Sequence, residues 1–535
     1  MASQIVSSPE STTGSSPAQQ SVEETPEQSS TANESTAPRN IRKRTTIQDA
    51  PRPTTPESNA PRRSFTRGRT LSSMLVPEKK IGPAPGFFQS IRSIILASWL
   101  NILLVFIPVS WALNFTLKDA VAHKDTIVFI MSFLAIIPLA KLLAFATDEL
   151  SMRVGQTLAG LLNATLGNAV ELIVAIIALT KCELRVVQAS LVGSVLSNLL
   201  LVLGMCFFAG GLKYSEQGFG ASATQLNSSL LTISVIAVLL PAAFHLGINS
   251  TDASATPDTK KEGADILALS RGVSIILLFI YCGYLVFQLY SHKNLYQDTG
   301  DHVMKTIHYA PEVNKMKKIK FFRSHKDEEK ADDVPARTAS PTQETQETNS
   351  TTHDLEKGER AKEEEEEIPQ LNLWMTAGLL VVVTVLVAVT AEWLVDSIDG
   401  LTESGGISKE FVGIILLPIV GNAAEHVTAV TVSVKDKLTL SLGVAVGSSI
   451  QIALFVIPFI ITLAWILGKP LTLLFDPYES ITLFLAVLTV NYVVQDGRSN
   501  WLEGMILMCL YLILGVTFWF YPGSDPSGVL SQCIR

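Results

Sequence analysis

Two short motifs in this chain place an asparagine and a glutamate at the same spacing within long apolar segments. In each motif a glycine precedes the asparagine and the glutamate follows three residues later, so the two polar side chains would share one helical face. The motif residues are Gly167, Asn168 and Glu171, and then Gly421, Asn422 and Glu425. A carboxylate within a bilayer is costly and usually marks an ion or proton path. The chemistry indicated is reversible binding of a cation or a proton.

Further oxygen donors follow both motifs at matched positions. Ser194 and Ser448 are 254 residues apart (448 minus 194), the interval that also separates Gly167 from Gly421 (421 minus 167), and Gln451 lies three residues beyond Ser448. The glycines weaken a helix, and an interrupted helix at membrane depth frees carbonyl oxygens that can line a cavity or bind an ion. Carboxylate, amide, hydroxyl and carbonyl oxygens are hard donors, which suit Ca²⁺ and, less selectively, Mn²⁺.

The candidate metal ligands are therefore Glu171, Glu425, Asn168, Asn422, Gly167, Gly421, Ser194, Ser448 and Gln451. For the hydroxyls and amides, and for Ser190, Ser197 and Asn198, hydrogen bonding between helices is an open alternative. A purely structural role suits the two glutamates less well. We expect Lys141 and Arg271 near span ends, and no other cation lies at comparable depth in the repeats to pair with the glutamates.

Three further residues are candidates for a proton path or for gating. His426 directly follows Glu425 and is either a proton carrier or a satisfied core histidine. Glu149 and Glu392 form a second matched pair, each near the end of an apolar segment one span upstream of a motif. The residues alone leave open whether these two are ordinary interfacial carboxylates or take part in gating.

Composition indicates an all-α membrane protein. The chain has 535 residues, of which 47% are hydrophobic and 17% are charged, whereas soluble proteins carry about 25% charged residues. The five cysteines are scattered without a CxxC pair, so we expect them to be inert packing residues.

Eleven apolar segments approach the roughly 20 residues that span a bilayer. They lie at 94–113, 127–146, 158–180, 186–212, 224–246, 267–290, 373–396, 411–434, 438–467, 479–495 and 499–521. We expect the long ninth segment to be tilted or kinked at Pro458. Apart from the first span, five segments lie on each side of a polar linker. An odd number of spans per unit makes the second copy inverted.

The expected organisation has six parts. They are a disordered basic tail (1–85), a first span and loop (86–125), repeat 1 (126–290), a linker (291–370), repeat 2 (371–522) and a short C-terminal tail (523–535). Positive charge before the first span favours a cytosolic N-terminus. The linker is then cytosolic, and the C-terminus lies on the far side. The linker ends in an acidic cluster, a candidate regulatory site, made of Glu363, Glu364, Glu365, Glu366 and Glu367.

The chain resembles the calcium/cation–proton exchanger (CAX) family over nearly all of 90–522. The resemblance rests on GNAVELIVAIIAL (167–179), SLVGSVLSNLLLVLG (190–204) and GNAAEHVTAVTVSVKDKLTLSLGVAVGSSIQIALF (421–455). It is greatest to fungal vacuolar calcium/proton exchangers, which implies a multi-pass protein of the vacuolar membrane. The resemblance also implies that Glu171 and Glu425 are the cation ligands and that the flanking polar residues assist them.

The residues suggest how such an exchanger would couple its ions. Two carboxylates neutralise one divalent cation, and without it they are two like charges at low dielectric, which favours protonation. Protons and Ca²⁺ therefore compete for the same oxygens, and alternating access carries either load across the membrane. No cofactor, nucleic acid or enzymatic activity is expected. Mn²⁺ is a second candidate cation, and the oligomeric state, a homo-oligomer included, stays open.

Three other functions are compatible with parts of this pattern. A sodium/calcium exchanger shares the inverted-repeat plan, and sodium dependence of uptake would distinguish it. An intramembrane hydrolase needs clustered His and Asp metal ligands, and only His245 and His426 lie in the apolar segments. A receptor or scaffold would not explain duplicated buried glutamates.

Overall fold

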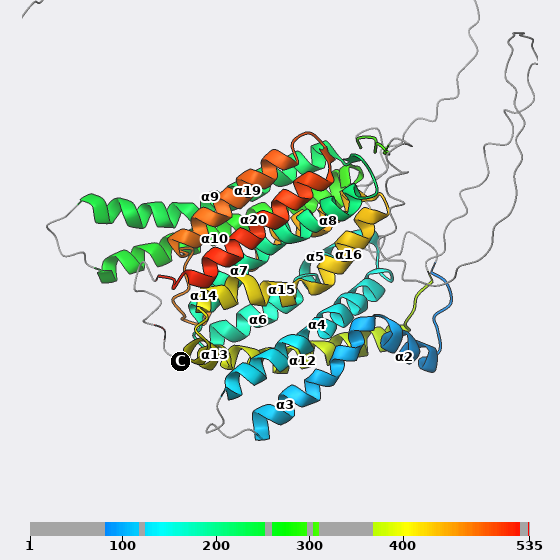
Figure 1. Cartoon of the computed structure of the whole chain (residues 1–535), viewed down its shortest axis with the longest axis horizontal. Helices are drawn as coiled ribbons and strands as arrows, with labels where there is room; N and C mark the ends of the chain where they lie inside the picture. The colour runs from blue at the N-terminus through cyan, green and yellow to red at the C-terminus, as the bar shows by residue number, and fades with distance from the viewer. Residues whose placement is uncertain are drawn as a thin grey trace, which may run out of the picture. The chain divides into compact units, whose positions relative to one another are not determined.

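The computed structural model describes residues 81–116, 123–251, 259–296, 303–309 and 368–524, together with Cys533. The basic tail up to residue 80 and the acidic cluster Glu363–Glu367 lie outside the described residues. The described chain is almost entirely helical (Figure 1), as the composition predicts.

The helices of the first half begin before the first expected span and end at the linker. They are α2 (Phe87–Leu96), η1 (Trp99–Val105), α3 (Phe106–Thr116), α4 (Lys124–Ser151), α5 (Gln156–Leu166), α6 (Ala169–Thr180), α7 (Leu184–Leu196), η2 (Ser197–Val202), α8 (Leu203–Gly211), α9 (Ala221–Thr251), α10 (Thr259–Val286), η3 (Phe287–Ser291) and η4 (Lys293–Tyr296).

The helices of the second half follow the linker. They are α12 (Leu373–Asp396), α13 (Ile398–Gly405), α14 (Lys409–Phe411), η5 (Val412–Leu416), α15 (Leu417–Gly421), α16 (Ala423–Val434), α17 (Leu438–Gln451), η6 (Ile452–Val456), α18 (Ile457–Ile466), α19 (Pro477–Val493) and α20 (Trp501–Phe520). Two short strands, β1 (Gln217–Gly218) and β2 (Arg498–Ser499), pair antiparallel.

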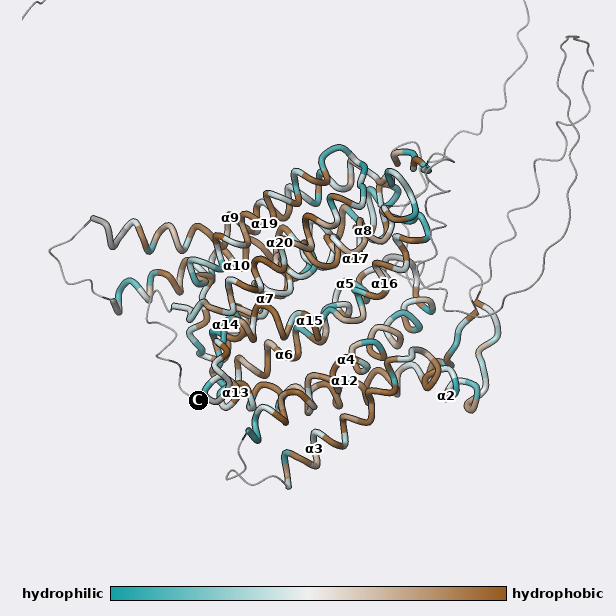
Figure 2. The backbone as a smooth tube through the Cα atoms, viewed as in Figure 1, coloured by the Kyte–Doolittle hydropathy of each residue, from teal (hydrophilic) through white to brown (hydrophobic). Residues whose placement is uncertain are grey.

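The helices are long and apolar enough to cross a bilayer at nearly every expected place. Among the described residues, eight single helical spans meet that description, and two bent helix pairs raise the number to ten. The remaining expected segment, 479–495, corresponds to α19, which has 17 residues. Figure 2 shows the apolar residues running along the length of the bundled helices.

Two segments form the centre of the bundle, namely α7–η2–α8 and α17–η6–α18. In the most apolar 18-residue stretch of these two segments, 83% and 78% of the residues are buried, compared with 22% in α20. Helices that are surrounded by protein are apolar on all sides. Both segments contain a π-helical turn, η2 and η6, at matched places. The turn η6 ends two residues before Pro458, and the tilt or kink expected at that proline stays a prediction.

The two repeats pack against each other through glycines. Gly193 on α7 lies against the backbone of Ile414 on η5, and Gly413 on η5 lies against Ala189 on α7. A Cβ atom at either glycine would collide with its neighbour. Small residues permit such close approach between membrane helices, so these glycines fix how closely α7 and η5 cross.

The start of the linker adds to the small sheet. Ile307 exchanges backbone hydrogen bonds with Glu216, and Thr306 Oγ1 donates to Asp436 Oδ1 at 2.9 Å. Asp436 lies in the turn after α16, with a positive φ of 63°. The linker is therefore anchored beside the end of a motif-bearing helix.

The expectation that all five cysteines are inert is wrong for two of them. Cys182 and Cys533 form a disulfide across a sequence separation of 351 residues, and scattered positions gave no signal for it. The other three, Cys206, Cys282 and Cys509, are free.

Candidate cation-binding site

Both glutamates lie just after a break in a helix. The α5 and α6 segments are bent by 45°, and the Lys409–Gly421 and α16 segments by 58°. Asn168 and Asn422 are the N-cap residues of α6 and α16, which puts Glu171 and Glu425 in the first helical turns. The N-terminus of a helix carries partial positive charge and free N–H groups. These two breaks therefore place each carboxylate where its charge is stabilised.

A hydrogen-bond network joins the two repeats at this point. Asn168 Nδ2 donates to Gln451 Oε1 at 2.7 Å, and Ser448 Oγ donates to Asn168 Oδ1 at 2.7 Å. Asn198 Nδ2 donates to Ser448 Oγ at 3.0 Å. The sequence predicted these residues as polar neighbours of the glutamates, and the structure brings the four together across the repeat boundary.

The second motif lacks the equivalent bonds. Asn422 is fully buried, and both its amide atoms are without a hydrogen-bond partner. The described buried atoms without a partner also include Oε2 of Glu171, Oε2 of Glu425 and Oδ1 of Asn198. An unsatisfied buried polar atom costs about 1–3 kcal/mol. These unpaired atoms around two carboxylates leave oxygen lone pairs available to a proton or a cation.

Two cavities of different size reach the glutamates. The larger, about 330 Å³, is lined by Glu425, Ser448 and Gln451, and we call it the vestibule. The smaller, about 20 Å³, is lined by Glu171, Ser190 and Ser194. Since one water needs about 10–15 Å³, the smaller cavity has room for a water or two. The two glutamates thus have unequal access.

The glycines of the breaks allow the site to form. The Glu171 carboxylate lies so close to Gly421 that a Cβ there would be 2.8 Å from Oε1, and Gly421 lines both cavities. Glu425 is near enough to Glu171 for their charges to interact.

Among the described residues, no group of three or more His, Cys, Asp or Glu could hold a metal. A cation here would rely on the two carboxylates and on amide and hydroxyl oxygens.

Sequence reasoning missed one charged residue of the vestibule lining, Asp148, and the contact that Lys141 makes with the lining residue Thr428. Asp148 lines the vestibule near the end of α4, and Lys141, seven residues earlier, donates from Nζ to Thr428 Oγ1 at 3.3 Å. Because α4 extends to Ser151, Lys141 lies within the helix rather than near a span end as expected. The face that α4 turns to α16 depends on packing between repeats, so neighbouring Glu149 looked equally suitable.

Glu149 and Glu392 lie apart from both cavities. Glu149 is 2% exposed and accepts hydrogen bonds from the backbone N–H groups of Gln370 (3.0 Å) and Leu371 (3.1 Å), at the end of the linker. Glu392 is half-exposed and pairs with Lys181 at 3.2 Å. The structure therefore does not bring them to the site, and their gating role stays a prediction.

His426 lies outside the lining of both cavities. Its Nε2 atom lies 3.5 Å from Ser197 Oγ on η2. This position favours the core-histidine alternative, while the proton-carrier role stays untested.

Comparison with known proteins identifies the family of this chain. The profile of the family described as "Sodium/calcium exchanger protein" matches residues 124–290 and 375–520, with one motif in each stretch. The chain is 54% identical over 491 residues to a "Vacuolar calcium ion transporter" of Cryptococcus neoformans var. grubii, covering 86% of this chain and 80% of the relative. It is 40% identical over 421 residues to a "Ca(2+)/H(+) antiporter" of Synechocystis sp., covering 79% and 97%.

The fold has a counterpart among solved structures. The structure of native YfkE matches with a TM-score of 0.55 and 29% identity, covering 79% of this chain and all of that one. A second structure of that protein describes it as a Ca²⁺/H⁺ antiporter. The chain belongs to the sodium/calcium exchanger family of membrane transporters, and within it to the calcium/cation–proton exchangers.

Proposed function

We propose that this antiporter exchanges cytosolic Ca²⁺ for luminal H⁺ across the vacuolar membrane, with Glu171 and Glu425 binding the cation and the protons in competition. The observation that carries the proposal is the pair of carboxylates at two helix breaks, one from each repeat. Each keeps an oxygen without a hydrogen-bond partner. The hydrogen bonds from Asn168 to Ser448 and Gln451 join the first break to α17 of the other repeat.

Charge explains the coupling. Two ionised carboxylates in a buried site repel each other, so the site is stable when it holds one divalent cation or when protons neutralise it. The empty charged site is the least stable form and the least able to change conformation. Exchange follows because the site crosses only when loaded.

The unequal cavities support alternating access. The vestibule beside Glu425 extends to Asp148 near the end of α4, the end at which Glu149 holds the linker. Access from the linker side is therefore wide, whereas the Glu171 cavity is small. In the expected topology this is the state that receives Ca²⁺ from the cytosol. Movement of α4 and α12 against the broken helices would close the vestibule beside Glu425 and open the cavity beside Glu171.

The vacuolar location and the cation rest on different support. Relatives named vacuolar calcium ion transporters in Cryptococcus neoformans and Schizosaccharomyces pombe, 54% and 39% identical, support the vacuole and Ca²⁺. Hard oxygen ligands are the support for Mn²⁺ as a second cargo. A cytosolic N-terminus and linker follow from the charge of the tail.

Sodium/calcium exchange is the second candidate, because the family profile includes such proteins. The site offers one motif carboxylate in each repeat, which suits one divalent cation better than several Na⁺ ions. Sodium-driven uptake without a pH gradient would favour this alternative.

The decisive test is cation uptake into vesicles that contain the purified full chain. An inside-acid pH gradient should drive ⁴⁵Ca²⁺ uptake, a protonophore should abolish it, and an imposed Na⁺ gradient should not replace it. Adding Mn²⁺ in excess tests the second cargo by competition. Uptake that is insensitive to the protonophore would contradict proton exchange.

A further inference from the structure

The segment after α20 is held to the rest of the bundle by one aspartate. Tyr521 Oη donates to both Asp476 carboxylate oxygens, at 2.8 and 2.9 Å, and Ser524 donates to Oδ2 from its backbone N (2.7 Å) and from Oγ (2.8 Å). Asp476 also caps α19 by accepting from Tyr478 N at 2.8 Å. Asp476 is 6% exposed. One buried carboxylate thus joins the C-terminal segment to α19.

The same segment lies on an ion pair between the two repeats. Arg185 on α7 pairs with the buried carboxylate of Glu410 on α14. Gly523 lies so close to both side chains that it leaves no room for a Cβ. Just before this segment, in the last turn of α20, Phe518 O accepts a hydrogen bond of 3.2 Å from Ser408 Oγ at the N-cap of α14. The segment therefore contacts the ends of both helices that lead to the site.

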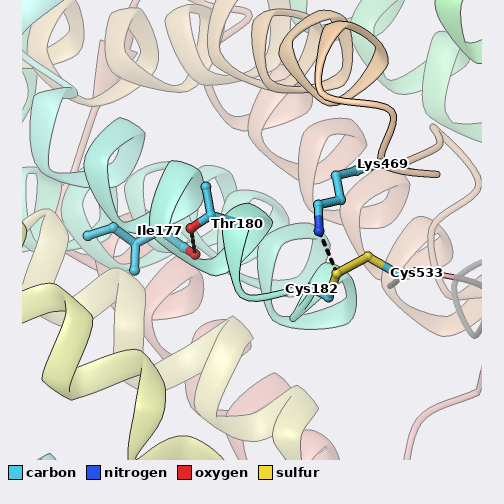
Figure 3. Close-up of a disulfide and its surroundings, with 5 residues drawn as sticks. All are labelled: Ile177, Thr180, Cys182, Lys469 and Cys533. Atoms are coloured by element: carbon cyan, nitrogen blue, oxygen red, sulfur yellow. Dashed lines mark hydrogen bonds between the residues drawn. A yellow bond between two sulfur atoms is a disulfide. The ribbon is translucent and has the colours of Figure 1, made fainter. Parts of the chain in front are cut away.

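A disulfide makes the third attachment. Cys533 is bonded to Cys182, in the turn between α6 and α7, and Lys469 Nζ lies 2.9 Å from Cys182 Sγ (Figure 3). Since α4 ends at the linker and the α5–α6 segment returns from there, Cys182 lies at the opposite end of the bundle. In the expected topology that end is luminal, where oxidising conditions permit disulfides.

We propose that Tyr521–Ser524 and Cys533 form a clasp that positions the two site-bearing arms. One arm is α7, which carries Ser190 and Ser194 five and nine residues beyond Arg185. The other arm runs from Glu410 through α15 to the break before Glu425. The inference rests on the proposed function, because the arms matter only if their oxygens bind the transported cation.

The clasp affects the site through direct packing. Gly193 on α7 touches the backbone of Ile414, so the arms are in contact between the clasp and the site. If the clasp ends separate, α7 shifts against η5, and Ser194 moves relative to Glu171 and Gly421 in the smaller cavity. A binding site must hold its ligands to within about 0.5 Å. The clasp is thus a positioning element for cation binding.

The test compares cysteine variants of the full chain in vesicles. Cys182→Ser, Cys533→Ser and the double variant should each raise the Ca²⁺ concentration for half-maximal uptake by the same factor, about fivefold or more, with a smaller change in maximal rate. The effects should not add, because the variants break one bond. Cys282→Ser and Cys509→Ser, at exposed free cysteines, are the matched controls and should change nothing.

Two further measurements keep the test decisive. Thiol alkylation with mass analysis should find Cys182 and Cys533 blocked in the untreated protein, and a dithiol reductant should give the wild type the half-saturation of the variants. Asp476→Asn weakens the clasp with the disulfide intact and should raise half-saturation in the same direction. All uptake is measured well below each variant's thermal midpoint, so a loss of stability alone does not change the result.

The outcomes separate the two proposals. Free thiols at both positions, or an unchanged half-saturation with the bond broken and with Asp476→Asn, would overturn the clasp. If the wild type takes up no Ca²⁺ under a pH gradient, the proposed function fails, while the alkylation result still reports on the bond. Should the cysteine variants not fold, reduction of the wild type and Asp476→Asn decide.

Discussion

The two repeats share a motif but not a set of bonds. Asn168 is hydrogen-bonded to Ser448 and Gln451, whereas the equivalent Asn422 has no partner for either amide atom. Glu425 faces the vestibule, while Glu171 faces a cavity of about 20 Å³. The two motifs have nearly identical sequences, but they differ in hydrogen bonding and in the size of the adjacent cavity. The proposed alternating access would require such a difference, since each half would then adopt in turn the state of the other.

Part of the difference between repeats is fixed by sequence. The residue 254 positions before Gln451 is Ser197, and the one before Ile452 is Asn198. Ser197 lies beside His426 instead of bonding Asn422. The possible partner of Asn422 in repeat 1, Ser197, thus has a shorter side chain than Gln451, which is the partner of Asn168 in repeat 2. We infer that the hydrogen-bond network of the observed state, with the vestibule open, is stronger than that of the opposite state, in which Ser197 would face Asn422.

Removing either glutamate charge should have the largest effect. Glu171→Gln and Glu425→Gln keep size and shape but leave one carboxylate for a divalent ion and one proton site fewer. Loss of one partner from a buried charge arrangement costs about 2–5 kcal/mol, so proton-driven ⁴⁵Ca²⁺ uptake should fall about 100-fold or more in either variant. An equal loss of uptake in both variants would show that the two glutamates are equivalent over the transport cycle, although their cavities differ in size in this state.

Glu→Gln changes within Glu363–Glu367 are the control and should do far less. Membrane localisation of each variant is checked before transport is compared. Substantial proton-coupled uptake by correctly localised Glu171→Gln or Glu425→Gln protein would refute the two-carboxylate site.

The asparagines should separate stability from transport. Asn168→Ala removes the acceptor of the Ser448 hydroxyl and the donor to Gln451 Oε1. This loss costs about 1–3 kcal/mol and should lower the thermal midpoint of the purified protein. Asn422→Ala removes no hydrogen bond present in this state, so its midpoint should change little. Both variants should slow Ca²⁺ uptake, because each asparagine serves one half of the cycle. An equal fall in the thermal midpoint of both variants would contradict the difference in hydrogen bonding between Asn168 and Asn422.

The sequence predicts the site better than the surroundings of the site. The 254-residue interval predicted that Glu171 and Glu425 occupy equivalent positions, and the structure places each of them just after a helix break. Their role as ligands stays a prediction. Asp148 was missed in favour of Glu149, since which of two adjacent carboxylates faces the vestibule is decided by the packing of α4 on repeat 2. The disulfide joins positions 351 residues apart, and no local pattern marks such a contact.

A smaller change tests whether Gln451 biases the open vestibule. Gln451→Ser gives repeat 2 the side chain that repeat 1 has at Ser197 and removes one hydrogen bond of about 1 kcal/mol. The open state should then be less populated. In a background lacking the free cysteines, a thiol reagent should label Thr428→Cys, in the vestibule, about fivefold more slowly. Unchanged or faster labelling would place the bias elsewhere.

The smallest effects are expected from two charged residues of α4, namely Asp148 in the vestibule lining and Lys141, which contacts the lining residue Thr428. Asp148→Asn removes a negative charge near the entrance and should raise the Ca²⁺ concentration for half-maximal uptake about two- to threefold at low salt. Lys141→Gln removes a positive charge and should lower that concentration by a similar factor. Both shifts should fade near 0.5 M KCl, because salt screens charges that are accessible to water. Opposite signs with a shared salt dependence would identify the vestibule as the path of Ca²⁺ to Glu425, whereas shifts of the same sign would indicate that the substitutions act by disturbing α4.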